Sequence, residues 1–357
     1  MKKTIGYDYQ AFAMQKIGGV SRYFCELMKH SNGLFNYTVG GIYSDNYYAK
    51  ELGFHKSPPI KLKKRKEDFW QKWVNRRDTL KKLSEKCDII HPTYYDTWST
   101  EKTDKPIVIT VYDMVHEIFP QFFSQFPDKK PLIEHSSKII AISQNTKNDI
   151  LRFYPHINPD KISVVYLGTS WEISGNIPLI PAEPPYVLFT GDRGGYKNFS
   201  NFISAVAPLL LKYDLKLKCS GSPLKNTQID LLKQHKIFDR TSAQFANEDE
   251  LKKLYANALC FVFPSLYEGF GIPILEAFAC GCPLALSDAS CFPEIADNAG
   301  IYFDPNSIEN MREKIDNIIS SETLRKDLIS KGYERLTNFS WQKCAEQTAK
   351  EYGKLYL

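Results

Sequence analysis

The sequence predicts an α/β protein built from two doubly wound, Rossmann-like domains. Its 357 residues exceed the size at which a single hydrophobic core keeps growing, so two domains of comparable size are expected. Short apolar runs rich in β-branched residues alternate with segments of helical periodicity, as in parallel sheets covered by helices. This alternation stops once, in a segment rich in glycine and proline, and then restarts.

The first half of the chain supplies the strands and helices of one such domain. Predicted strands cover 3–7, 89–91, 107–111, 138–141 and 162–166, and predicted helices include 21–29 and 144–153. Glycine and proline residues then cluster in 167–185, where periodicity vanishes. We place the domain boundary there, with the N-terminal domain at 1–170.

The second half repeats the pattern. Predicted strands cover 186–190, 215–219, 260–263 and 283–286, and predicted helices cover 198–213, 249–258, 273–279, 307–320 and 322–336. A last amphipathic helix is predicted over 341–357, after a C-terminal domain at 171–340. Two such units in tandem place a cleft at their strand ends, where ligands of doubly wound folds bind.

Composition and cysteine usage predict a globular protein that stays in the cytosol. Hydrophobic residues make up 43% and charged residues 24% of the chain. The first residues lack the apolar stretch of a signal peptide, and no later segment offers about 18 uncharged apolar residues. The eight cysteines are scattered in apolar runs and are expected to be reduced. Cys280 and Cys282 lack further metal ligands nearby, so no metal site is predicted.

Positive charge is concentrated in one segment. Residues 61–86 hold eleven Lys or Arg and four Asp or Glu, whereas the whole chain carries a net charge of +5. Within 61–77 the cations alternate with Phe69, Trp70 and Trp73, which favours contact with anionic lipid headgroups. The alternative is a solvated helix with its aromatic residues in the core. Nucleic acid is not expected as a partner, because the rest of the chain is net acidic and shows no recognised binding module.

A glycine-rich turn follows the predicted strand 186–190 and leads into a helix. It reads Gly-Asp-Arg-Gly-Gly-Tyr-Lys-Asn over 191–198. Backbone N–H groups at such a helix N-terminus bind phosphate, and Arg193 and Lys197 add two positive charges. The spacing is not that of the dinucleotide fingerprint, so the turn predicts a diphosphate site without redox chemistry. A tight turn with solvated basic side chains is the alternative.

Two acids follow the predicted strand 260–263. Glu268 lies in a glycine-containing loop, and Glu276 lies in a helix that Pro273 opens. This spacing lets both carboxylates point into one cleft and accept hydrogen bonds from sugar hydroxyls. Alternatively, Glu276 pairs with a neighbouring base. If the two carboxylates instead served as acid and nucleophile of a glycoside hydrolase, the basic turn would have no role.

The block 264–283, which contains both acids, resembles the signature of glycosyltransferase family 4, whose retaining enzymes have the GT-B fold. The resemblance covers most of the chain. Further matching segments are, in order, 18–23, 141–144, 191–198, 254–258, 293–296 and 339–341. It implies two Rossmann-like domains with an interdomain cleft, and a C-terminal helix, 341–357, that returns to the N-terminal domain.

The resemblance also implies roles for individual residues. Arg193 and Lys197 would hold the donor diphosphate and stabilise the charge on the leaving group without a metal ion. Glu276 would bind the nucleotide ribose, and Glu268 would approach the sugar hydroxyls. The leaving phosphate takes the acceptor proton, so no protein nucleophile is sought. The catalytic candidates are Glu268, Asp113, Arg193 and Lys197, and the further donor-binding candidates are Gly18, Gly19, Gly221, Phe245, Gly269, Phe270, Gly271 and Glu276.

One departure from the family pattern leaves the donor sugar open. Tyr112 stands where many relatives have a histidine that touches this sugar, although the Asp113 that often follows is present. Tyr112 and His116 can equally be packing residues, and His91 at another strand end can be structural. These four residues, His91, Tyr112, Asp113 and His116, are the acceptor-side candidates.

The predicted activity is retaining transfer of a hexose-type sugar from a GDP- or UDP-linked donor to a glycan or lipid-linked acceptor, with no cofactor beyond the nucleotide sugar. By analogy with the family, the product is an envelope polysaccharide or glycolipid such as lipopolysaccharide. The expected location is the cytoplasm, with peripheral contact to the inner face of the plasma membrane. Two alternatives stay open: a nucleotide-sugar epimerase of the same fold, and a non-catalytic protein that binds nucleotide sugars or membranes.

Overall fold

The computed structural model describes residues 2–57, 64–101, 103–173 and 184–356, and of residues 64–69 the backbone alone. The chain divides into two compact units. The N unit comprises Met1–Met114, Phe123–Leu167 and Trp341–Leu357, and the C unit comprises Val115–Phe122 and Gly168–Ser340. Much of the segment predicted to separate the domains, 174–183, lies outside the described residues.

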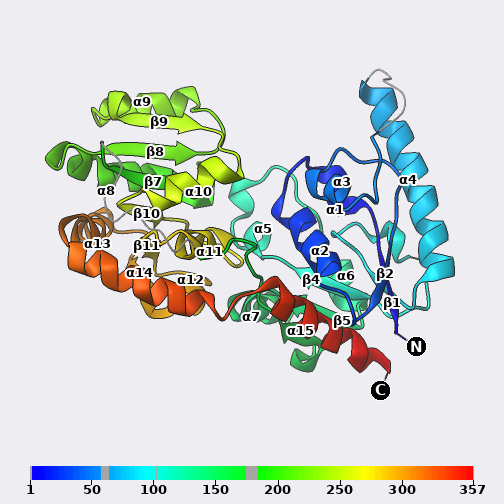
Figure 1. Cartoon of the computed structure of the whole chain (residues 1–357). Coiled ribbons are helices and arrows are strands. Elements are labelled where there is room, and N and C mark those ends of the chain that lie inside the picture. Colours follow the sequence, from blue (N-terminus) through cyan, green and yellow to red (C-terminus); the bar gives the residue numbers. More distant parts are fainter. Residues whose placement is uncertain (1, 58–63, 102, 174–183, 357) are drawn as a thin grey trace. The chain divides into compact units, whose positions relative to one another are not determined.

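The N unit contains two three-stranded parallel sheets (Figure 1). Its strands are β1 (Thr4–Tyr7), β2 (Asn36–Val39), β3 (Ile89–His91), β4 (Val108–Val111), β5 (Lys138–Ala141) and β6 (Ile162–Val164). The strand orders are β2-β1-β3 and β4-β5-β6, and a bridge between Ile90 and Ile107 links the two sheets. β4 and β5 are buried along their whole length, as expected for strands covered on both faces.

The C-terminal helix belongs to the N unit. The helices of this unit are α1 (Gln10–Met14), α2 (Gly19–Lys29), α3 (Tyr47–Glu51), α4 (Lys64–Lys86), α6 (Lys130–His135), α7 (Gln144–Phe153) and α15 (Trp341–Gly353). α15, red in Figure 1, packs on α2, where the rings of Tyr23 and Trp341 lie 6.4 Å apart. This confirms the predicted return of the helix. Its predicted end at residue 357 was wrong, because the helix stops at Gly353 and a 3-10 turn, Lys354–Tyr356, follows.

The C unit is a single doubly wound sheet. Its strands are β7 (Tyr186–Thr190), β8 (Lys216–Ser220), β9 (Thr241–Gln244), β10 (Cys260–Phe263), β11 (Leu284–Ser287) and β12 (Ile301–Phe303), in the parallel order β12-β11-β10-β7-β8-β9. Its helices are α5 (Val115–Ile118), α8 (Phe199–Lys212), α9 (Asn226–Gln234), α10 (Glu248–Ala256), α11 (Ile272–Ala279), α12 (Phe292–Ala296), α13 (Ile308–Ser320) and α14 (Glu322–Leu336). A continuous apolar core joins the sheet to α8 and α13. The predicted α/β class with two Rossmann-like units is confirmed.

Three strands that the sequence did not predict, β2, β9 and β12, all lie at the edges of their sheets. β2 and β9 are mostly exposed or alternate in exposure, so they lack the continuous apolar run of a central strand. Edge strands of this kind are positioned by pairing with a buried neighbour rather than by their own hydrophobicity.

The 23-residue helix α4 carries most of the basic segment. Residues 61–63 of that segment lie outside the described residues. Within the described ranges, no helix combines the length and the apolar character needed to cross a bilayer.

Candidate functional site

The glycine-rich turn after β7 forms a short 3-10 turn, Gly195–Lys197, before α8 begins at Phe199. Asn198 adopts a left-handed conformation with φ of 58°, and its side-chain amide donates a 2.8 Å hydrogen bond to the carbonyl of Pro305. Gly195 cannot carry a side chain, because a Cβ atom there would lie 2.8 Å from the Phe122 ring. Arg193 and Asn198 of the turn are buried, whereas its three glycines and Asp192 are exposed.

Arg193 is buried against the loop that follows β8. Its guanidinium Nη2 donates to the carbonyl of Ser222 and, at 3.3 Å, to that of Pro223, while Nε donates to Oε1 of Gln228 at 3.2 Å. The remaining nitrogen, Nη1, is buried and has no hydrogen-bond partner among the described residues. A buried donor without a partner is energetically costly, so this nitrogen marks a place where a ligand oxygen would fit.

Gly221 lies beside that guanidinium. Its φ of +141° favours glycine, and a Cβ atom would lie 2.6 Å from the carbonyl oxygen of Gly191 and 3.6 Å from Nη1 of Arg193. Its N–H donates a 3.0 Å hydrogen bond to the carbonyl of Gln244, and the next residue, Phe245, is 69% exposed. The predicted donor residues Arg193, Gly221 and Phe245 therefore come from neighbouring loops.

Lys197 and Glu268, which are 71 residues apart, form an ion pair of 2.6 Å between Nζ and Oε1. Burial is the largest single effect and favours the neutral amine, but Glu268 and Tyr196 together outweigh it, so the pKa of Lys197 is raised. The backbone N–H of Glu268 donates to Oγ of Ser290 at 3.1 Å, which fixes the start of the acidic loop. The structure thus brings the basic turn and the first predicted acid together.

Glu276 lies in α11, which begins after Gly271 with Pro273 in its first turn, and is 8% exposed. Burial, and then the Glu276 charge, raise the pKa of Tyr255. Tyr255 in turn bonds Oγ1 of Thr190 at 3.1 Å, at the end of β7. Glu276 therefore lies near Tyr255, whose hydroxyl contacts the carboxyl end of β7, where doubly wound sheets bind ligands.

The segment Val115–Phe122, of which the sequence had singled out only His116, packs against both loops. The ring of Phe119 lies 6.5 Å from that of Tyr196, nearly parallel to it, and 6.5 Å from that of Tyr267. The two loops are also joined directly, since the N–H of Leu266 donates to the carbonyl of Tyr196 at 2.8 Å. No local sequence pattern predicts these contacts, because they form between segments that are distant in the sequence and come together only in the folded chain.

In the N unit, Gly18 caps α2 and Gly19 begins it. A Cβ atom on Gly19 would have no neighbour within 4 Å, so this helix N-terminus is open. Asp113, which follows β4, pairs with the buried Lys129 at 3.6 Å between Oδ1 and Nζ. Sequence reasoning missed Lys129, which lies 16 residues further along the chain. These features place backbone N–H groups and a fixed carboxylate at two loops of the same unit.

The family can be decided from the sequence itself. The model described as Glycosyltransferase Family 4 matches residues 17–170, and the model described as Glycosyl transferases group 1 matches residues 172–335. This chain belongs to glycosyltransferase family 4. The predicted family is thus confirmed over both halves of the chain.

Relatives of this family 4 chain agree with that assignment. O-antigen chain mannosyltransferase B of Escherichia coli is 28% identical over 242 residues, and the alignment spans 62% of this chain and 62% of that protein. The chain thus matches less than two thirds of that relative's own length. A glycosyltransferase from Rickettsia africae ESF-5 is 20% identical with a TM-score of 0.73, covering 99% of this chain and 98% of that one. Anabaena Alr3699/HepE in complex with UDP and glucose is 16% identical with a TM-score of 0.74, covering 99% and 100%. The structural likeness shows the GT-B fold.

In this family 4 chain, His91 lies in the core of the N unit. It is fully buried, with Nδ1 at 2.7 Å from the hydroxyl of Tyr352 and Nε2 at 3.0 Å from Oγ1 of Thr110. Burial lowers the pKa of His91 to about 3. Both ring nitrogens of His91 contact core hydroxyls, so neither is available to a ligand.

The other two acceptor-side candidates fall in different units. Tyr112 stays in the N unit, where its ring packs against those of Tyr23 and Tyr95 and its N–H donates to the hydroxyl of Tyr95 at 3.1 Å. Burial raises its pKa well above the usual value. His116 lies in α5 of the C unit. Three of the four acceptor-side candidates thus belong to the N unit and one to the C unit.

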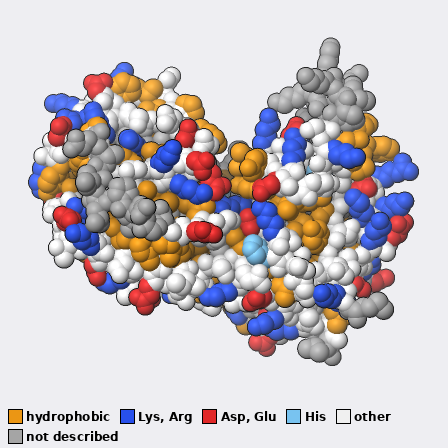
Figure 2. Space-filling model, viewed as in Figure 1, with side chains coloured by type: hydrophobic (Ala, Val, Ile, Leu, Met, Phe, Trp, Pro, Cys, Tyr) orange, Lys and Arg blue, Asp and Glu red, His pale blue; other side chains and the backbone are white. Residues whose placement is uncertain are grey.

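The basic helix α4 presents cations to solvent, and Lys and Arg side chains gather over it in Figure 2. Trp73 is 55% exposed, whereas Trp70 packs on Tyr43 with ring centroids 5.3 Å apart. The side chain of Phe69 lies outside the described residues. One indole of the pair is therefore packed and the other is exposed.

Elsewhere in the chain, the eight cysteines are free and buried. Among the described residues, no three His, Cys, Asp or Glu side chains form a group that could hold a metal ion.

Proposed function

We propose that this chain is a retaining glycosyltransferase that moves a hexose-type sugar from a GDP- or UDP-linked donor to a glycan or lipid-linked acceptor. The observation that carries the proposal is the convergence in the C unit of Lys197, paired with Glu268, and of Arg193, whose Nη1 is buried without a partner among the described residues. A lysine paired with a carboxylate, and on the same turn a guanidinium with a nitrogen left for a ligand, suit a diphosphate attached to a sugar.

In this proposal the cations act on the leaving group. The bond between the anomeric carbon and the diphosphate oxygen breaks, and the acceptor oxygen bonds to that carbon on the same face. The acceptor proton passes to the departing diphosphate. Arg193 and Lys197 stabilise the negative charge that grows on this group, which is the contribution that lowers the barrier. No protein nucleophile is required.

The acids recognise hydroxyl groups. Glu276, held in α11, accepts hydrogen bonds from the ribose, and Glu268 accepts them from the donor sugar. Gly269, Phe270 and Gly271 shape the loop between them. Gly221 and Phe245 border the nucleoside. We assign these roles to the C-terminal domain, 171–340.

The N-terminal domain, 1–170, is proposed to bind the acceptor. Gly18 and Gly19 offer helix N–H groups to the donor phosphate, and Asp113 contacts a sugar hydroxyl. The name of the Escherichia coli relative supports an envelope polysaccharide as product. The cations and the exposed Trp73 of α4 support peripheral contact with an anionic membrane.

Thermal unfolding with UDP, GDP, ADP, CMP and their sugar conjugates tests the donor site. A ligand at a hundredfold excess over its Kd adds about 2.7 kcal/mol to the free energy of unfolding. We therefore expect one nucleotide to raise the melting temperature clearly more than the others do. Lys197→Ala should abolish that shift. Lys212→Ala is the matched control, because Lys212 forms an exposed ion pair with Asp316 in the same unit. If the nucleotide still raises the melting temperature of both variants, the diphosphate assignment is wrong. Analysis of the reaction products separates sugar transfer from epimerisation.

A further inference from the structure

We propose that a groove in the N unit binds an acceptor saccharide that carries a phosphate group. The inference rests on the proposed glycosyl transfer and names the class of its acceptor. The groove lies where the loops after β1 and β3 meet α4, and its volume is about 610 Å³. Small-ligand sites span about 300–1,000 Å³, so one or more sugar rings fit. Lys72, Trp73 and Arg76 belong to the segment 61–77 that the sequence offered as a membrane surface, and the other lining residues were not site candidates.

Aromatic rings form much of this groove. Tyr9 and Trp98 lie with ring centroids 5.4 Å apart and are each 8% exposed, so they form a fixed floor. Trp73 of α4 adds an indole that is 55% exposed. Rigid aromatic side chains offer large apolar surfaces at small entropic cost, and the C–H face of a sugar ring packs on such surfaces. An uncharged or purely aliphatic ligand would give no role to the charged side chains that also line the groove.

The charges of the groove specify an anion. Lys72 and Arg76 line it and make no ion pair with any described residue, and the Arg76 guanidinium lies 5.2 Å from the centre of the Trp98 ring. Asp96 also lines the groove, and its Oδ1 accepts a 3.3 Å hydrogen bond from the backbone N–H of Trp98. Two cations against one carboxylate leave a positive surplus. Phosphate suits the cations, and the carboxylate suits a sugar hydroxyl.

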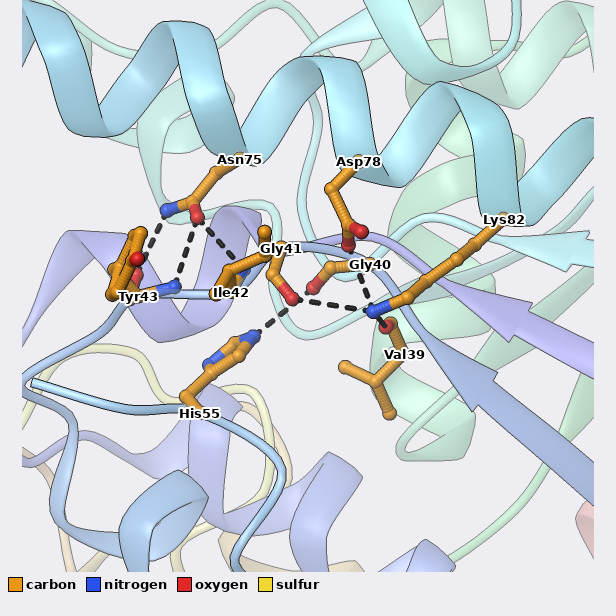
Figure 3. Close-up of polar contacts among 9 residues, drawn as sticks. All are labelled: Val39, Gly40, Gly41, Ile42, Tyr43, His55, Asn75, Asp78 and Lys82. Atoms are coloured by element: carbon orange, nitrogen blue, oxygen red, sulfur yellow. Dashed lines mark hydrogen bonds and ion pairs between the residues drawn. The ribbon is translucent and has the colours of Figure 1, made fainter.

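The α4 side of the groove is held in place by hydrogen bonds, which Figure 3 shows. Oδ1 of Asn75 accepts from the N–H groups of Ile42 and Tyr43 at 2.8 and 3.0 Å, and its Nδ2 donates to the carbonyl of Tyr43 at 2.8 Å. About two turns onwards, Nζ of Lys82 donates to the carbonyl of Val39 at 3.0 Å. The helix that carries the exposed indole and the cations is therefore fixed to the loop after β2.

The opposite side is fixed by a buried carboxylate. Asp8 accepts hydrogen bonds from the hydroxyl of Thr93 at 2.6 Å, from that of Ser99 at 2.8 Å and from the side-chain amide of Gln10 at 2.7 Å. The Gln10 side chain also bonds both backbone groups of Asp96. The loops after β1 and β3 are thereby locked together. A preformed groove loses little entropy on binding, which is expected of a built site.

Fluorine NMR of protein labelled with 5-fluorotryptophan tests the proposal. The chain has five tryptophans, of which Trp73 and Trp98 line the groove. We expect a hexose 1-phosphate to shift the signals of these two residues and to leave those of Trp171 and Trp341 unchanged. The neutral methyl hexoside should bind about tenfold more weakly, because it lacks the charge-assisted contacts.

Substitutions separate charge recognition from general effects. Arg76→Gln should weaken binding of the hexose 1-phosphate about fivefold, and Lys81→Gln, the same charge change at an exposed position of α4 outside the groove, should leave it unchanged. A citronellyl diphosphate-linked hexose that binds more tightly than the hexose 1-phosphate identifies a lipid-linked acceptor, whereas equal binding identifies a free phosphate-bearing glycan. Either result supports the groove.

Two results would overturn the inference. If the Trp73 and Trp98 signals stay unmoved by every probe, the groove is not a saccharide site. If the methyl hexoside binds as well as the phosphate and Arg76→Gln changes nothing, phosphate is not what the groove recognises. The melting temperature of the same labelled protein with UDP and GDP reports on the donor site separately. A groove that does not bind saccharide can therefore be distinguished from a donor site that does not bind nucleotide.

Discussion

Nζ of Lys197 lies 2.6 Å from Oε1 of Glu268, so the proposed phosphate-binding cation is already paired with the acid proposed to bind the donor sugar. A diphosphate entering this site meets the lysine together with a competing carboxylate. The pair holds Lys197 charged, since the pKa of Lys197 is raised. It also keeps both side chains in fixed positions before the donor arrives.

Glu268→Gln should therefore separate binding from catalysis. Without the competing charge, Lys197 is available to the diphosphate, and we expect the nucleoside diphosphate to bind at least as tightly as to the unsubstituted chain. Turnover should fall about a hundredfold, because a positioned contact to the reacting sugar is lost. Calorimetric titration and turnover measured side by side check this, and a parallel loss of both would contradict it.

Arg193→Lys should weaken donor binding although the positive charge is kept. A lysine cannot contact the Ser222 carbonyl and Gln228 and still present a further nitrogen to the ligand, as the guanidinium does. We expect a roughly tenfold rise in the Kd of the nucleoside diphosphate. Arg240→Lys is the control, because Arg240 pairs with the exposed Asp214 elsewhere in the C unit.

Gly221→Ala should destabilise the chain. The added Cβ would meet the Gly191 carbonyl at 2.6 Å, and the φ of +141° disfavours any side chain. We expect a loss of about 1–3 kcal/mol in the free energy of unfolding, measured by urea denaturation. Gly19→Ala, where the added atom has no neighbour within 4 Å, should leave stability unchanged. Equal stability of both variants would show that the turn adapts.

Acid should destabilise the fold through His91. Burial lowers the pKa of His91 to about 3, from a usual value of 6.5. Between these values the unfolded chain binds a proton that the folded chain does not, so the free energy of unfolding falls as pH drops below about 6.5. At about pH 5 the loss from this group reaches at most about 2 kcal/mol.

Urea denaturation from about pH 7 to about pH 5 measures this effect, with His91→Gln as the comparison. The variant should be less stable at neutral pH, because the bonds to Tyr352 and Thr110 change, but its stability should depend less on pH. Some dependence should remain, since burial also lowers the pKa of His55, to about 4. An unchanged slope would show that His91 is protonated in the folded chain.

The central strands and the two motifs of the C unit could be predicted from sequence because their signals are local. Continuous apolar runs mark strands buried on both faces, as in β7 and β10, and glycine before a basic residue marks a turn. Edge strands such as β9 were not predicted, because pairing with a buried neighbour defines them rather than their own hydrophobicity. His91 was placed at a strand end correctly, but its burial depends on Tyr352, which lies 261 residues away.

The sequence by itself determined the two α/β units, the family and the candidate residues of the basic turn and the acidic loop. Only the tertiary structure decided which of these side chains meet. It paired Lys197 with Glu268, buried Arg193 against the Ser222 loop, and set Asp113 beside Lys129. It also assembled a groove from Tyr9, Trp73 and Trp98, residues that share no motif. The physical reason is that periodicity and turn chemistry act over a few residues, whereas these contacts form between segments that only packing of the sheets brings together.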